Sequence, residues 1–144
     1  MSFQRYSPDQ VKISFSGITV TGFQDGTFVE VERSEDQYTT HVGSLGDVTR
    51  TRNLNKTGKI TVTLMQHAPI NDLLSITLAA DALGDTPARS IMVKDLTNGM
   101  LCHASNAWIE KTPKIERGKE SAGIQWVFAC ADLEVVPSNT ALAI

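Results

Sequence analysis

The chain has 144 residues, a formal net charge of −3 at pH 7 and a pI near 5.5. Apolar residues make up 41% and charged residues 20% of the sequence, a balance that excludes a disordered chain. The acidic charge argues against a protein that grips nucleic-acid phosphates, although it is compatible with a surface past which DNA slides. The first twenty residues predict no secretion signal, and the longest apolar run, residues 126–131, is too short for membrane insertion.

The length is typical of one compact domain, and we expect a single domain over residues 1–144. Its core is expected over residues 6–136, followed by an exposed tail over residues 137–144.

The N-terminal residues alternate between apolar and polar side chains, as a strand does. Val11, Ile13 and Phe15 fall on one face of a strand over residues 11–16, and the alternation resumes over residues 18–22. Gly17 interrupts the pattern, so we expect a bulge or bend there.

Asp25-Gly26 is a hairpin-turn signal, which predicts a partner strand over residues 28–33. The two faces of this partner strand differ, because Val29 and Val31 alternate with Glu30 and Glu32. One face is expected in a core, and the other is acidic.

Residues 34–46 are too many for a tight turn and too poor in spaced apolar residues for a helix. Irregular loops of this length are uncommon in compact domains and are often functional. Residues 47–54 alternate like a strand but offer little apolar surface on either face. They predict a strand that is exposed or paired with another chain.

The most regular strand pattern covers residues 59–66, with Ile60, Val62 and Leu64 on one face. One α-helix is predicted after it, over residues 69–83. Pro69 suits the first turn of that helix, and Asn71 and Asp72 place polar groups near its N-terminus. Ile70, Leu73, Leu74 and Leu78 form its apolar stripe, and Gly84 is expected to end it in a left-handed conformation.

The last third of the chain returns to strands. Residues 91–96 and 100–104 flank Asn98-Gly99 and predict a hairpin. A short irregular strand is expected over residues 108–115, and residues 123–136 predict one long central strand that is apolar on both faces. Trp108 and Trp126 are expected in the core. Together the elements predict a mainly β fold, a β-sandwich or barrel of antiparallel strands with one flanking α-helix.

The sequence offers no recognisable catalytic, cofactor-binding or metal site. His41, His67 and His103 are scattered, and none has the spacing of a zinc ligand. Cys102 and Cys130 are expected to be buried and reduced, with an intrachain disulfide as the alternative. No catalytic residue, cofactor or metal is therefore predicted.

The order of the motifs is similar to that of a known family. It runs from the N-terminal strand pair through Glu35-Asp36-Gln37 and the loop Gly43-Ser44-Leu45-Gly46-Asp47 into Thr49-Arg50-Thr51-Arg52-Asn53. The strand over residues 58–66, the segment Ala68-Pro69-Ile70-Asn71-Asp72-Leu73-Leu74 and the closing β region follow. Over about residues 6–136 the chain resembles the tail-tube proteins of contractile-tailed bacteriophages, which are related in fold to type VI secretion tube proteins. Leu45 departs from the smaller or acidic residue expected in the Gly-rich loop, which leaves that loop's contacts open.

The resemblance implies a structural subunit that is not an enzyme. Copies of the chain would form hexameric rings stacked into a hollow tube, the conduit for genome ejection inside a contractile sheath. The implied partners are sister copies, the tail sheath, the baseplate or tube initiator, and the tape-measure and tail-terminator proteins. DNA would pass through the lumen without specific binding. The implied location is the virion tail, assembled in the cytoplasm of the bacterial host.

Three groups of residues are expected to serve assembly or passage. Segment 34–46 is expected to reach a neighbouring subunit, with Glu35, Asp36, Gln37, Tyr38, Gly43, Leu45, Gly46 and the adjoining Asp47 as its contact residues. Arg50 and Arg52 either pair with acids of a neighbour or are solvated. Glu30 and Glu32, interpreted as an acidic strip and not as a catalytic pair, are expected to face the lumen.

Two other functions fit the same sequence. A tube protein of a secretion system or contractile bacteriocin would obey the same physics with a different cargo. A small ligand-binding β domain, or an enzyme with an unrecognised site, is the other alternative.

Overall fold

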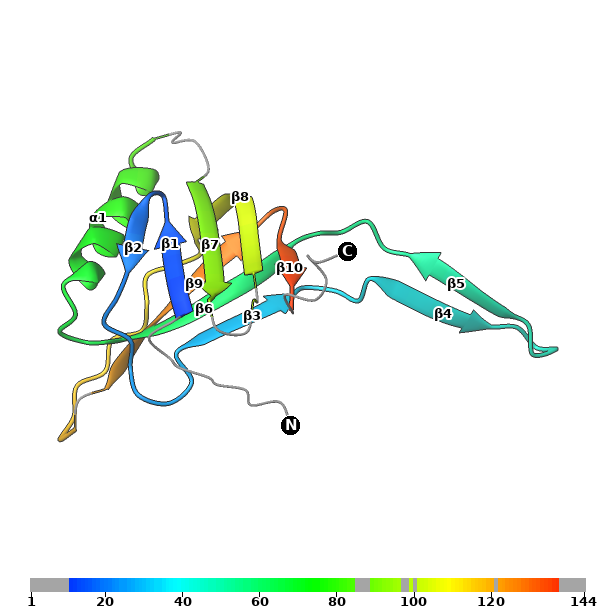
Figure 1. The fold of residues 1–144 in the computed structure, drawn as a ribbon, viewed down its shortest axis with the longest axis horizontal. Helices are drawn as coiled ribbons and strands as arrows, with labels where there is room; N and C mark the ends of the chain where they lie inside the picture. Colours follow the sequence, from blue (N-terminus) through cyan, green and yellow to red (C-terminus); the bar gives the residue numbers. More distant parts are fainter. Residues whose placement is uncertain (1–10, 85–88, 97–98, 100, 121, 138–144) are drawn as a thin grey trace.

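The computed structural model describes residues 11–84, 89–96, 99, 101–120 and 122–137, and the expected tail beyond Pro137 lies outside them. This part of the chain is mainly β, with antiparallel strands and one flanking helix, as the sequence predicts (Figure 1). In chain order its elements are β1 (Val11–Phe15), β2 (Ile18–Val20), β3 (Val29–Arg33), β4 (Tyr38–Val42), β5 (Val48–Arg52), β6 (Gly58–Met65), α1 (Ile70–Ala82), β7 (Arg89–Asp95), β8 (Leu101–Ile109), β9 (Gly123–Cys130) and β10 (Glu134–Val136).

Eight strands form one sheet in the order β2-β1-β7-β8-β9-β6-β3, with β10 added beside β8. The sheet folds over at β8. The first half of that strand, residues 101–104, pairs with β7, and its second half, residues 107–109, pairs with β9. The result is two layers, one formed by β2, β1, β7 and β10 and the other by β9, β6 and β3, joined through β8.

The core lies between the two layers. Phe15 on β1 and Phe128 on β9 are far apart in the order of the sheet, yet their ring centroids are 4.7 Å apart. Ile60, Val62 and Leu64 of β6 are fully buried, because period-two alternation turns all three toward this core. The strand prediction for this segment is confirmed.

The helix is also confirmed, at residues 70–82 instead of 69–83, but its stripe and its end differ from the prediction. Ile70 and Leu74 are buried, whereas Leu73 is 46% exposed because it lies at the edge of the buried face of the helix. Asn71 and Thr77 occupy buried positions in its place. The helix ends at Leu83 in a right-handed conformation, so the left-handed stop at Gly84 is wrong.

The N-terminal region turns at both predicted places, but its strands pair differently from the prediction. Ser16 and Gly17 have positive φ values of 53° and 80°, and they form a tight turn that pairs β1 with β2, where a bulge or bend was expected. Asp25-Gly26 does turn the chain, with Gly26 at φ 90°, but it does not join a hairpin. The strand after it, β3, pairs with β6 instead, because Val29 and Val31 cover the core there.

Segment 34–46 is not irregular. Residues 38–42 form β4, which pairs with β5 in register from Tyr38 opposite Arg52 to Val42 opposite Val48. The strand expected over residues 47–54 is present as β5 and is exposed, as one of the two expectations had it, and within the chain it pairs with β4. Figure 1 shows these two strands as a hairpin that extends away from the sandwich.

The closing region is broken into more pieces than expected. The strand predicted over residues 108–115 is limited to the end of β8, and residues 110–120 have no strand. The long strand over residues 123–136 is interrupted after Cys130, where the chain turns so that β10 can pair with β8. Trp126 is buried as expected, but Trp108 is 44% exposed. Strands β7 and β8 form the predicted hairpin, and Asn98 of its turn signal lies outside the described residues.

Candidate assembly surfaces

The hairpin arm, residues 34–54, is the most exposed part of the structure that the model describes. Every residue of β4 and β5 is exposed. Its base is tied to the sandwich by the Ser34 amide, which donates to the Thr57 carbonyl just before β6 at 3.0 Å. Within the arm, the Asn53 amide donates to the Gln37 carbonyl at 2.8 Å and joins its two sides. The arm is thus a directed projection that begins where β3 ends.

A side-chain network fixes the direction of the arm at its base. The Asn53 side-chain amide donates to a Glu35 carboxylate oxygen at 2.7 Å, and the Asn53 side-chain carbonyl accepts from the Asn55 amide at 3.0 Å. Side-chain hydrogen bonding from Asn53, and secondly from Asn55, favours the charged carboxylate and lowers the pKa of Glu35.

A second tie joins the arm's base to β10. Lys56 donates to Glu134 at 3.0 Å, and Arg33 lies 3.9 Å from the other carboxylate oxygen of Glu134. The hydrogen bond and charge of Lys56 lower the pKa of Glu134. All three groups are partly exposed, so this tie positions the base more than it stabilises the fold.

The two faces of the arm differ in chemistry. Residues opposite each other in an antiparallel pair share a face, so Tyr38, Val42, Val48, Arg50 and Arg52 lie on one face. Arg50 stacks on the Tyr38 ring at 4.7 Å from its centroid, which gives this arginine a partner within the chain. The opposite face holds Thr39, His41, Thr49 and Thr51.

The tip of the arm is apolar. Leu45 is 91% exposed, and Val42 and Val48 behind it are 68% and 67% exposed. The turn closes through the Gly43 amide, which donates to the Asp47 carbonyl at 2.6 Å, and Gly46 supplies the positive φ of 89° that the turn needs. Leu45 therefore projects beyond the last backbone hydrogen bonds.

A second surface is the outward side of the layer formed by β3, β6 and β9, called here the outer polar face. Glu30 and Glu32 lie on it opposite Thr61 and Lys59 of β6, which in turn lie opposite Val127 and Ala129 of β9. Lys59 bonds to Glu110 at 3.1 Å. Glu30 and Glu32 are exposed, and they stand on β3, the edge strand of the sheet.

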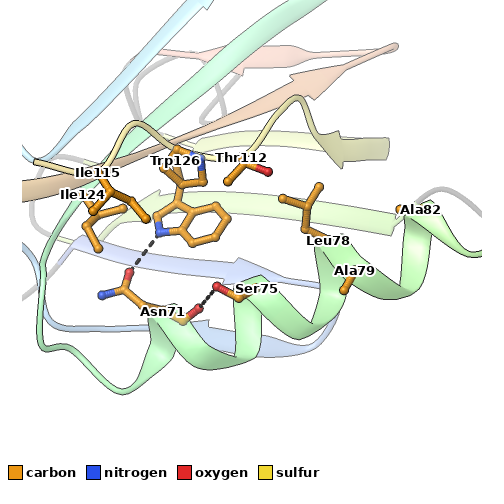
Figure 2. A pocket seen from close by; sticks show the side chains of 10 residues that line it. Asn71, Ser75, Leu78, Ala79, Ala82, Thr112, Ile115, Ile124 and Trp126 are labelled. Carbon is orange, nitrogen blue, oxygen red and sulfur yellow. Dashed lines mark hydrogen bonds between the residues drawn. The ribbon is translucent and has the colours of Figure 1, made fainter.

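A third surface is an apolar groove between α1 on one side and residues 112–115 and 124–126 on the other, called here the helix groove. It encloses about 320 Å³ and is lined by Asn71, Ser75, Leu78, Ala79, Ala82, Thr112, Pro113, Ile115, Ile124 and Trp126. Figure 2 shows the Trp126 indole N–H donating to the Asn71 side chain, at 2.9 Å. Asn71 in turn donates to the Met65 carbonyl at 2.9 Å, so its amide holds the floor of the groove in place.

The side chains that could serve in catalysis or metal binding are dispersed over the structure. His41 lies on the arm, His67 after β6 and His103 on β8, and the described residues contain no group of three His, Cys, Asp or Glu side chains arranged to hold a metal. Cys102 and Cys130 are buried free thiols, and burial raises the pKa of both, that of Cys130 to about 11. Within the described part of the chain, no helix is long and apolar enough to span a membrane.

The structure separates the predicted site residues into two places. The predicted contact residues of segment 34–46, with Asp47, Arg50 and Arg52, come together on one arm, while Glu30 and Glu32 lie on the sandwich. The sequence reasoning missed the strand β4 and the helix groove. A signal for β4 was available, because β-branched runs stand on both sides of a short loop with two glycines.

The fold of this chain is shared with solved structures from contractile injection systems. The fold is similar to that of the anti-feeding prophage cap, a tube-terminating cap, with a TM-score of 0.65 and 12% identity over 96% of this chain and 95% of the other. It is also similar to a chain of the PVC sheath-tube complex in its extended state, with a TM-score of 0.58 and 14% identity over 92% of each chain. PVC is an extracellular contractile injection system.

The sequence identifies the family. The model of the bacteriophage PhiTE tail tube protein family matches residues 10–137, and the chain belongs to this family. It is also 31% identical over 132 residues to structural protein ORF10 of Pseudomonas phage KPP10, across 86% of this chain and 76% of the relative. The protein is a phage tail structural protein.

Proposed function

We propose that this chain is the repeating subunit of the tail tube of a contractile phage tail. As a single tail-tube domain without catalytic role or cofactor, it assembles into hexameric rings that stack into the hollow conduit for genome ejection. Its partners are the sheath around the tube, the initiator and terminator at the two ends, and the tape-measure protein inside.

The observation that carries this proposal is the exposed hairpin arm. A two-stranded hairpin on its own is marginally stable in water, because it has no second layer on which to bury apolar side chains. Every strand residue of the arm is exposed, and its tip presents Val42, Leu45 and Val48 to solvent. Such an arm is stabilised when the surface of a sister subunit covers it.

The edges of the main sheet support assembly in the same way. Strand β3 ends the sheet, and its outer edge has no paired strand among the described residues. Exposed edges are templates for pairing with another chain, and closure into a barrel removes them. Edge-to-edge joining of sister copies would close a ring, and stacking of rings would add length.

The second layer has the dimensions that a tube needs. It contributes four strands, namely β3, β6, β9 and the second half of β8. Six copies would give about 24 strands, and with a spacing of ~4.8 Å and a tilt of ~40° the backbone diameter is about 48 Å. Inward side chains would leave a bore of roughly 40 Å, wide enough for a DNA duplex.

We place the outer polar face toward that bore. On β3, on β6 and at the end of β8, Glu30, Glu32 and Glu110 supply three negative charges and Lys59 one positive charge, a net charge of −2 for these four residues. A negative wall repels phosphates weakly, so DNA slides without binding.

Electron microscopy of the purified chain tests the proposal. At high concentration we expect rings or tubes from the intact chain, and none from a variant in which residues 36–52 are replaced by two glycines. The deletion leaves the base of the arm in place, so the far-UV circular dichroism of the sandwich should be retained. A full-length chain that stays monomeric at every concentration would contradict the proposal, and so would normal tubes from the shortened chain.

A tube protein of a related contractile injection device is the second candidate, favoured by the fold shared with the anti-feeding prophage cap and the PVC chains. The two candidates differ in cargo. Double-stranded DNA in the purified particle would support the phage tail, and protein cargo would support the injection device.

A further inference from the structure

A second hollow lies beside the start of β9, on the outward side of the layer formed by β3, β6 and β9. It is called here the basic hollow and encloses about 370 Å³. Gln125 and Val127 point into it, because Trp126 and Phe128, which alternate with them, are buried in the core. The basic hollow therefore opens on the outer polar face and is separate from the helix groove. It is lined by Lys111, Pro113, Lys114, Glu116, Gly123, Gln125 and Val127.

One cation of the basic hollow has no ion pair within the described part of the chain. That cation is Lys111. The two acids nearest to it in sequence, Glu110 and Glu116, bond to other lysines at 3.1 Å and 2.7 Å. The hollow thus keeps one uncompensated positive charge beside the apolar side chains of Pro113 and Val127. Such a surface favours an occupant that is partly apolar and carries one negative charge.

The tip of the hairpin arm has that composition. Within residues 42–48, Asp47 is the one charged residue, and among the described residues it takes part in no ion pair. Leu45 near it is 91% exposed. The nearest arginine, Arg50, is held over the Tyr38 ring, so Asp47 sets the charge of the tip.

The two surfaces lie at opposite ends of the layer. Strand β6 pairs with β9 from Gly58 opposite Cys130 to Met65 opposite Gly123. The arm begins beside Gly58, since Arg33 lies opposite it, whereas the basic hollow lies at the Gly123 end. Figure 1 shows the arm at one end of the long axis of the molecule and the segment between β8 and β9 at the other. The tip therefore meets a basic hollow only on a second copy of the chain.

We propose that the basic hollow receives the arm tip of a second copy of this chain, with Leu45 against Pro113 and Val127 and with Asp47 paired to Lys111. Each copy then offers a tip to one neighbour and a hollow to another. Such a head-to-tail contact propagates, as stacking of rings requires. Because the hollow opens at the end of the outer polar face, the contact lies at the end of the neighbouring ring's bore. The inference rests on the proposed function and adds the site that receives the arm.

Site-directed crosslinking tests the contact. The variant with Ser44→Cys and Gln125→Cys carries one thiol on the tip and one in the basic hollow, and it leaves Leu45 in place. The native Cys102 and Cys130 are buried and do not compete. After assembly and treatment with a short bis-maleimide, we expect a ladder of covalent multimers on a denaturing gel.

The matched control combines Ser44→Cys with Ala79→Cys, which places the second thiol in the helix groove instead. Docking holds the tip and the basic hollow at millimolar effective concentration, so the hollow pair should give about tenfold more crosslinked multimer than the control pair. Circular dichroism checks that each variant folds. If Gln125→Cys does not fold, Val127→Cys replaces it, since Val127 also lines the hollow.

Reversal of the two charges tests the ion pair separately. Lys111→Glu should raise the protein concentration at which tubes form by about tenfold, because two negative charges then meet across the contact. Adding Asp47→Lys to that variant should return the concentration close to that of the parent chain, because the pair is restored with its signs exchanged. Electron microscopy over a concentration series measures both effects.

Each outcome has one meaning. Tubes without a ladder from the hollow pair, or with equal ladders from both pairs, overturn the docking of the tip but leave the proposed function standing. Tubes from Lys111→Glu at the concentration of the parent chain, or no recovery on adding Asp47→Lys, also overturn the docking. Absence of tubes from the parent chain at every concentration overturns the two proposals together.

Discussion

At the scale of single residues, Asn71 contributes more than its helical position suggests. Its side chain accepts from Trp126 and donates to the carbonyls of Met65 and Gln66, joining helix, sheet and turn at one buried point. A buried indole N–H and two carbonyls obtain their partners from one amide. Such a group is hard to replace, because an unpaired buried donor keeps the full penalty of leaving water.

We expect Asn71→Ala to lower the free energy of unfolding by about 2 kcal/mol, because the Trp126 N–H then lacks its acceptor. Urea unfolding, followed by far-UV circular dichroism below the concentration of assembly, measures the change in every variant, including those without Trp126. Trp126→Phe in the Asn71→Ala background is the matched control, since it removes the orphaned donor and should add little further loss. A stability equal to that of the parent chain would show that water satisfies the indole.

At the scale of elements, the pairing of β6 with its neighbours depends on the absence of a side chain at Gly58. A Cβ there would meet the Glu32 carbonyl oxygen at 2.7 Å and would also collide with Leu133. Gly58 is the point where β3, β6 and the turn before β10 come together, at the base of the arm. The backbones of β3 and β6 are closely packed at this point, next to the base of the arm.

Gly58→Ala is expected to destabilise the fold by about 1–3 kcal/mol, because the backbone of β3 has to move to admit the methyl group. Chemical denaturation measures the loss. Gly118→Ala, at a position with nothing within 4 Å of the added Cβ, serves as the control and should be close to neutral. Equal stability of the two variants would mean that β3 is free to shift.

At the scale of the whole molecule, the chain has differentiated surfaces on its arm, on its outer polar face and beside its helix. A protein that worked as a monomer would gain little from an exposed arm with an apolar tip. In the proposed tube two of these surfaces have separate roles, because the arm joins subunits and the outer polar face lines the bore. In this arrangement, the charge of the bore determines how easily DNA passes through it.

A phage carrying Glu30→Lys and Glu32→Lys should assemble tails but eject DNA slowly. The change converts the net charge of residues 30, 32, 59 and 110 on the outer polar face from −2 to +2 per subunit, since two negative charges are replaced by two positive ones. Infectivity should fall by about tenfold or more, because phosphates then adhere to the wall.

The pair Glu30→Gln and Glu32→Gln is the control for this test, because it removes charge without creating attraction. Unchanged infectivity of the lysine variant, with normal tails in micrographs, would place these residues away from the bore.

The mainly β class, the position of the helix and the strands with a buried face could all be predicted from the amino-acid sequence. Residues such as Ile13, Val62 and Phe128 alternate with period two, and that alternation is a local consequence of burying one side of a strand. The similarity to tail-tube proteins could also be seen in the sequence, because it depends on the order of these segments along the chain.

The pairing of the strands and the arrangement of the polar segments could be known only from the folded chain. Asp25-Gly26 would turn the chain whether β3 paired with the strand before it or with β6. The partner of β3 was settled by the fit of Val29 and Val31 on the core beside β6. Strand β4 escaped prediction because the arm buries no face in its own chain, so its residues carry no apolar alternation. The helix groove is formed by α1, residues 112–115 and β9, which are distant in sequence, and a surface made by distant segments exists only once the chain has folded.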